Sequence, residues 1–156
     1  MVEQDPQPEN ALLEAERTKS HSDGSFIRVL LVDDNGPFRR FVREALGEMP
    51  DIQIVGEAID GLEAVRKAQE LKPALIVLDI GLPGLNGIEA ARRIRRLSPQ
   101  SKILFLSQES SVEVVQEALS LGALGFVTKI NAGRDLLIAV EAVLRNQQFV
   151  SSAVSC

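Results

Sequence analysis

The chain has 156 residues, of which 45% are hydrophobic and 25% are charged, so it is long enough for one domain with a real core. Six acids against Arg17 and Lys19 give residues 1–25 a net charge of −4, which leaves −1 of the total of −5 for the rest. A nearly neutral remainder argues against a broad nucleic-acid surface, which needs a clearly basic face.

The sequence also indicates the cellular compartment and limits the roles that cysteine can have. No apolar run is long enough to span a bilayer, and the first residues lack the charged and apolar segments of a secretory signal. The one cysteine, Cys156, excludes an internal disulfide and a thiolate metal site. We therefore expect a cytoplasmic protein without a membrane segment.

Residues 1–25 are polar and contain Pro6 and Pro8, which predicts a flexible tail outside the domain. From residue 26 to residue 148, short apolar runs alternate five times with segments of helical period, which is typical of a doubly wound α/β domain. The predicted strands carry largely apolar runs at 29–32, 52–55, 75–78, 103–106 and 126–128. Residues 149–156 are expected to form a short C-terminal tail.

Helix signals follow each predicted strand. The first helix opens after Asn35-Gly36, and its apolar residues recur at i, i+3, i+4, i+7, i+8 and i+11 from Phe38 to Met49. The second covers residues 62–71 and stops before Pro73. The later helices are expected to follow Asn86, Ser111 and Gly133.

Polar side chains end four of the predicted strands. Asp33 and Asp34 close the first apolar run, Asp79 the third, Ser107 the fourth, and Lys129 follows the fifth. The carboxyl ends of parallel strands meet at one edge of the sheet, so these groups are expected to converge. Mutually repelling carboxylates favour a divalent cation, and a cation beside a lysine favours an anion such as a phosphoryl group.

The order and spacing of these residues resemble a response-regulator receiver domain. Asp79 follows Asp34 by 45 residues, Ser107 follows Asp79 by 28, and Lys129 follows Ser107 by 22. The segment from Gly122 to Lys129 is similar to the NarL/FixJ type. The resemblance implies a flavodoxin-like (βα)5 three-layer sandwich with a parallel five-stranded sheet of order 2-1-3-4-5.

It also implies the roles of the residues. Asp79 would accept a phosphoryl group from a histidine kinase, with Lys129 and Ser107 binding the phosphoryl oxygens. Mg²⁺ would be held by Asp33, Asp34, Asp79 and the main-chain carbonyl of Gly81. Ser107 and Phe126 would form the switch.

The resemblance further implies how the signal leaves the domain. A homodimer or partner is expected on the surface of the fourth helix, fifth strand and fifth helix. DNA would be reached only through an output domain outside this chain, and enzymatic activity is expected to be limited to self-phosphorylation and autodephosphorylation.

Two positions depart from the family pattern. Gln108 follows Ser107 where a small residue is usual, and Ile130 follows Lys129 where many receivers have proline. Gln108 keeps open an alternative in which the domain is an interaction module that does not use phosphate. A Mg²⁺-dependent phosphatase with an aspartate nucleophile is less favoured, because that class needs a second aspartate where Gly81 stands.

Overall fold

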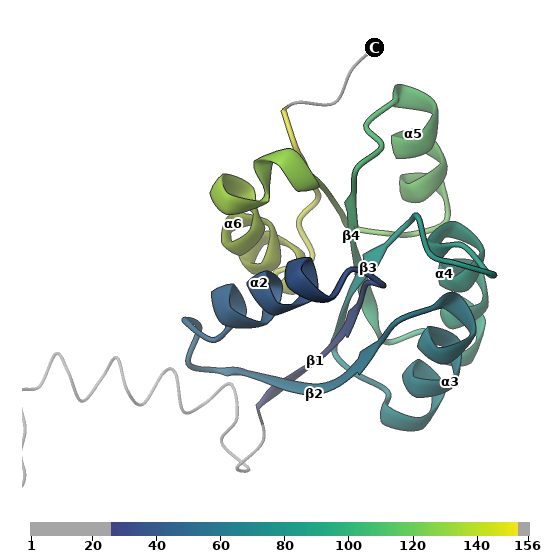
Figure 1. Ribbon diagram of the computed structural model, residues 1–156, viewed down its shortest axis with the longest axis horizontal. Coiled ribbons are helices and arrows are strands. Elements are labelled where there is room, and N and C mark those ends of the chain that lie inside the picture. The colour runs from purple at the N-terminus through teal and green to yellow at the C-terminus, as the bar shows by residue number, and fades with distance from the viewer. Residues whose placement is uncertain (1–25, 153–156) are drawn as a thin grey trace, which may run out of the picture.

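The computed structural model describes residues 26–152, and Figure 1 shows their arrangement. The flexible tail predicted for residues 1–25 lies outside the described residues, as do the last four residues, 153–156, of the predicted C-terminal tail. None of the helices between residues 26 and 152 is long and apolar enough to cross a membrane.

Strands and helices alternate along the chain, as predicted. The strands are β1 (Ile27–Val32), β2 (Ile52–Ala58), β3 (Leu75–Asp79), β4 (Lys102–Ser107), β5 (Gly125–Thr128) and β6 (Phe149–Val150). The helices are α2 (Gly36–Leu46), α3 (Gly61–Leu71), α4 (Gly87–Leu97), α5 (Val112–Ser120) and α6 (Ala132–Leu144), with a short 3-10 turn η1 (Lys129–Asn131). All adjacent strands are parallel, in the order β2-β1-β3-β4-β5-β6.

Polar caps start four of the five helices. The side chains of Asn35, Asp60, Asn86 and Ser111 each accept a backbone N–H from the first turn of the helix that follows. The predicted starts after Asn86 and Ser111 are therefore correct, whereas α6 begins one residue before Gly133. Met49, the last member of the first apolar series, lies beyond the end of α2.

Helices cover both faces of the sheet, which makes three layers. In Figure 1, α2 and α6 lie on one side and α3, α4 and α5 on the other. Two apolar clusters fill the spaces between the layers, one around Phe105, Phe126 and Ile94 and the other around Leu46, Leu104 and Val140. Strands buried on both faces explain why their sequences are continuous apolar runs.

The sheet has one strand more than the sequence predicted. β6, which was expected to belong to the C-terminal tail, pairs with β5, and Phe149 N–H donates to Leu124 C=O at 3.0 Å. Phe149 also packs against the second apolar cluster. Two residues are too few for a periodic pattern, so only the tertiary environment makes this segment a strand.

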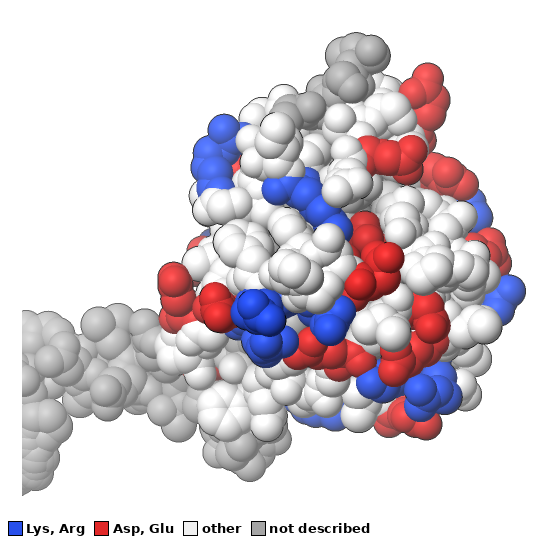
Figure 2. Space-filling view, viewed as in Figure 1, with Lys and Arg blue, Asp and Glu red and all other residues white. Residues whose placement is uncertain are grey.

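Charged side chains of both signs are interspersed on the face shown in Figure 2. Ion pairs also join charges of opposite sign on the described part of the chain, such as Arg92 with Glu117 at 2.8 Å and Arg43 with Glu57 at 2.7 Å. This face carries no continuous basic surface, in agreement with the composition.

Candidate functional site

The polar residues predicted at the strand ends meet at the carboxyl edge of the sheet. A cavity of about 400 Å³ opens there. It is lined by Asp34, Asn35, Asp79, Gly81, Ser107, Gln108, Glu109 and Lys129. Asp33 contacts it through its ion pair with Lys129. Residues spread over almost 100 positions of sequence therefore share one site, because β1, β3, β4 and β5 end at the same edge.

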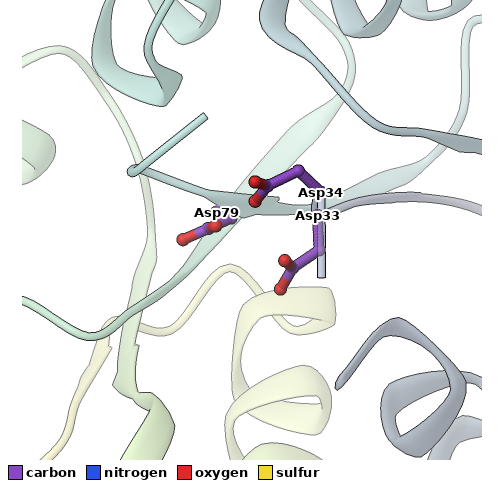
Figure 3. Close-up of side chains that lie close together, drawn as sticks. All are labelled: Asp33, Asp34 and Asp79. Carbon is purple, nitrogen blue, oxygen red and sulfur yellow. The ribbon is translucent and has the colours of Figure 1, made fainter. Parts of the chain in front are cut away.

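Three carboxylates form the acidic part of this site. Asp33 and Asp34 follow β1, Asp79 ends β3, and Figure 3 shows the three side chains close together. One oxygen of each lies within 4.8 Å of the others. Asp33 and Asp79 are 4% and 6% exposed, whereas Asp34 is exposed to solvent. This combination of buried and open oxygens suits a hard cation that keeps some of its water.

Backbone N–H groups orient the two buried carboxylates. Asn35 N–H donates to Asp33 Oδ1 at 2.9 Å, and Gly81 N–H donates to Asp79 Oδ1 at 3.3 Å. Both bonds use Oδ1, and the Oδ2 atom of each carboxylate faces Lys129. Asp33 Oδ2 is buried and accepts no well-aligned hydrogen bond from the described residues.

Lys129 supplies the positive charge of the site. Its Nζ lies 2.8 Å from Asp33 Oδ2 and 3.5 Å from Asp79 Oδ2, and its side chain is only 11% exposed. The ammonium therefore partly neutralises two carboxylates, although it does not satisfy Asp33 Oδ2 in hydrogen-bond geometry. A buried oxygen with a contact of this kind is a natural position for a further positive ligand.

The pKa of Asp79 is raised above its ordinary value. Burial is the largest cause, and the negative charge of Asp33 adds to it, while Lys129 and the Gly81 N–H act in the opposite direction. The raised pKa shows that the ionised Asp79 is under-compensated by its protein surroundings. A divalent cation would remove this imbalance, so the residues present fit Mg²⁺.

Ser107 and Phe126 lie on neighbouring strands. Ser107 is 1% exposed, and its Oγ accepts the Glu109 N–H at 2.9 Å. Phe126 is fully buried beside Phe105, with ring centroids 6.5 Å apart. Phe126 thus belongs to the core between β5 and the helices and does not line the cavity.

The structure adds two residues to those that the sequence predicted. The ring of Phe38 lies under Lys129 Nζ, with 4.6 Å between Nζ and the ring centroid. Arg39 donates to the main-chain carbonyl of Asp33 at 2.7 Å and pairs with Glu57 at 2.6 Å. The helical period placed Phe38 on a core face, and no local signal linked Phe38 to Lys129 or Arg39 to Glu57, which are about 90 and 18 residues away.

Known proteins resemble both the sequence and the structure. Residues 29–141 match the response regulator receiver domain family. A protein-glutamate methylesterase/protein-glutamine glutaminase of Thermotoga maritima is 46% identical over 104 residues, which cover 66% of this chain and 30% of that protein. The nitrate/nitrite response regulator protein NarL of Escherichia coli is 35% identical over 127 residues, covering 81% of this chain and 59% of NarL.

Two solved structures agree. A two-component response regulator of the LuxR family from Aurantimonas sp. superposes with a TM-score of 0.79 at 35% identity, covering 83% of this chain and 93% of that one. The response regulator domain of Thermotoga maritima CheB gives a TM-score of 0.69 at 38% identity, covering 78% and 95%. The chain spans less than two thirds of the length of the methylesterase relative and of NarL.

Proposed function

The chain belongs to the response regulator receiver domain family of two-component signalling, and we propose that Asp79 is the residue that accepts the phosphoryl group. One observation carries this proposal: three carboxylate oxygens lie within 4.8 Å of one another, beside an ammonium group, in an open cavity. Of the three carboxylates, Asp79 is the one that both lines the cavity and lies near Lys129 Nζ, at 3.5 Å, and it is close to Ser107 at the end of the next strand.

The transfer forms one bond and breaks one. A carboxylate oxygen of Asp79 forms the new O–P bond, while the bond from phosphorus to the donor histidine nitrogen breaks and its electron pair leaves with the donor. With acetyl phosphate as donor, the same step releases acetate. Histidine kinases are thus the partner class that we assign to this site.

Mg²⁺ is the cofactor that the acidic residues support. Asp33, Asp34 and Asp79 would hold it, together with the carbonyl of Gly81, and when bound it neutralises charge on the transferred group. The Lys129 ammonium, 3.5 Å from Asp79 Oδ2, would bind a phosphoryl oxygen. The raised pKa of Asp79 supports this assignment, since the ionised nucleophile has few other sources of compensation.

Ser107 and Phe126 are the switch residues of the proposal. The bond from Glu109 uses Ser107 Oγ as an acceptor, so its hydroxyl proton stays able to donate to a phosphoryl oxygen. Ser107 is paired with Thr128 in the β4–β5 register, and Phe126 lies two residues before Thr128. A shift of Ser107 toward a phosphoryl group would therefore be felt along β5.

The remaining assignments concern the complete protein. We propose that the protein acts in the cytoplasm and that a second copy or a partner protein binds the surface formed by α5, β5 and α6. Contact with DNA would require an output domain outside this chain. The methylesterase relative is an enzyme by name, but this chain matches only 30% of the length of that relative. The only chemistry that we propose for this chain is therefore the gain and loss of the phosphoryl group.

Intact-mass measurement after incubation with acetyl phosphate and Mg²⁺ tests the proposal. The wild type should gain one phosphoryl group and Asp79→Asn none. Asp60→Asn is the matched control, because Asp60 is a half-buried aspartate that does not line the cavity, and asparagine can keep the N-cap bond from Glu63 N–H; this variant should gain the group. Undiminished gain in Asp79→Asn would refute the assignment, and no gain in the wild type would favour the phosphate-independent module.

A further inference from the structure

The Lys129 ammonium is bounded on three sides. Asp33 and Asp79 lie on two of them, at 2.8 and 3.5 Å, and the ring of Phe38 forms the third, with its centroid 4.6 Å from Nζ. Phe38 belongs to the first turn of α2, far in sequence from η1, where Lys129 lies. The aromatic ring is therefore part of the immediate surroundings of the cation in the phosphorylation site.

An aromatic face does what a carboxylate cannot do at this position. Its quadrupole attracts the ammonium electrostatically without accepting a conventional hydrogen bond, so the N–H donors of Lys129 stay available to oxygen atoms. A third carboxylate would instead compete with an incoming phosphoryl oxygen for these donors. The attraction is strongest where water is excluded, and the Lys129 side chain is 11% exposed.

The ring is held by its own helix. Asn35 Oδ1 accepts the Phe38 N–H at 2.8 Å, and Asn35 N–H in turn donates to Asp33 Oδ1 at 2.9 Å. One turn further along α2, the ring of Phe41 packs against Phe38 with centroids 5.4 Å apart. The same hydrogen-bonded turn that orients the Asp33 carboxylate therefore also anchors Phe38.

We propose that Phe38 is a positioning residue for the phosphoryl transfer: its ring face keeps the Lys129 ammonium between Asp33 and Asp79, where it can bind a phosphoryl oxygen. This inference rests on the proposed function of Asp79. Without the attraction of the ring, Lys129 has four flexible side-chain torsions and one dominant partner, Asp33, at 2.8 Å. The ammonium would then spend less time within reach of a group on Asp79.

Fluorinated phenylalanines at position 38 provide the sharpest test, because fluorine withdraws the negative charge of the ring face while nearly keeping its shape. We expect the rate of phosphorylation by acetyl phosphate with Mg²⁺ to fall stepwise from phenylalanine through monofluoro and difluoro to pentafluoro rings. The total decrease should be about 3- to 10-fold, the range of a well-shielded cation–π contact. Phe38→Tyr should retain most of the rate, and Phe38→Leu should lose about as much as the pentafluoro ring.

Phe41 supplies the matched control. Its ring packs on Phe38, but the contact with Lys129 is made by Phe38. The same fluorinated series at position 41 should leave the rate unchanged. Melting temperatures measured for every variant separate a loss of fold from a loss of positioning, and in a Lys129→Met background the series at position 38 should have no effect.

A second readout does not depend on phosphorylation. In the unphosphorylated protein, the ring current of Phe38 should shift the Lys129 ε-methylene protons upfield in the NMR spectrum, and Phe38→Leu should abolish this shift. If Asp79 is phosphorylated but the rate is flat or rises across the series, the positioning role is refuted. If the upfield shift is present but no phosphoryl group is gained, the proposed function fails while the contact stands.

Discussion

Gln108 is the residue that sets this site apart from the family pattern. Its side chain is exposed and lines both the acidic cavity and a neighbouring groove of about 560 Å³ beside Phe38, Phe41 and Ile130. A long amide at this junction can cover a phosphoryl group on Asp79 and donate a hydrogen bond to it. It therefore lies where the groove adjoins the cavity.

We predict that Gln108→Ala shortens the lifetime of the phosphorylated protein by about 2- to 10-fold, because a less shielded ester is hydrolysed faster. Mass spectrometry after removal of the donor measures the decay. Gln116→Ala on the exposed face of α5 is the matched control and should decay like the wild type. Unchanged or slower decay in Gln108→Ala would mean that this side chain does not protect the phosphate.

Asp34 allows the metal site to be tested with little damage to the fold, because its side chain is exposed. Mg²⁺ should stabilise the wild type by about 1 kcal/mol at five times its Kd, a rise of a few degrees in Tm. The reason is that the cation compensates the burial of the Asp79 carboxylate and its repulsion by Asp33, which together raise the pKa of Asp79. Asp34→Ala should flatten this dependence in thermal unfolding, and a wild-type Tm indifferent to millimolar Mg²⁺ would contradict a site here.

At the scale of elements, β6 is fastened to β5 and α6 by a buried polar cluster. Ser151 Oγ accepts the Thr128 N–H at 3.1 Å and donates to Asp135 Oδ2 at 2.8 Å, and Arg134 donates to Asp135 Oδ1 at 2.9 Å. Thr128 directly precedes Lys129 in the chain. The cluster therefore holds the end of β5 in place and, with it, the backbone from which Lys129 enters the site.

Asp135→Asn should destabilise the domain at pH 7 by about 1–3 kcal/mol, since it weakens charge-assisted bonds to Arg134 and Ser151. The bond from Arg134 lowers the pKa of Asp135 below its ordinary value of 3.8. A carboxyl group with a lowered pKa stabilises the fold above 3.8 and loses this effect as the pH falls through the folded-state pKa.

The difference between wild type and Asp135→Asn should therefore be constant near neutrality and shrink below about pH 4. Urea unfolding at a series of pH values measures it. Ser152→Ala, which removes an exposed hydroxyl bonded to Arg134 next to the cluster, should change stability by less than about 0.5 kcal/mol. A difference that grows toward low pH would exclude this account.

At the scale of the whole molecule, the site is connected to one side of the sheet. Ser107 pairs with Thr128 in the register, Phe105 contacts Phe126, and α5 and α6 flank β5. Ile138 on α6 is 55% exposed, so α6 also has an apolar side chain in contact with solvent. We accordingly expect activation to alter the surface of α5, β5 and α6.

Hydrogen exchange with and without beryllofluoride and Mg²⁺ should show the largest changes between residues 111 and 145, because movement of Ser107 passes into β5 and its flanking helices. Asp79→Asn, which should not bind the phosphate mimic, serves as the control. Changes confined to residues 38–49 would instead place the output on α2.

The fold class and most of the site follow from the sequence alone. Continuous apolar runs identify buried parallel strands, and a polar residue after each run is carried to the same sheet edge by the parallel topology. This is why the sequence predicts that Asp33, Asp79, Ser107 and Lys129 lie together. The capping residues Asn86 and Ser111 likewise marked helix starts, because a cap acts within one turn.

Other features depend on contacts between segments that are distant in sequence, and only the tertiary structure decides them. β6 is a strand because β5 offers an unpaired edge and the core accepts Phe149, not because two residues carry a strand pattern. Phe38 follows the helical period of a core residue, yet folding brings its ring to Lys129, 91 positions away. Local sequence determines which face of a helix is apolar, whereas the packing of that helix determines which charged group its aromatic ring meets.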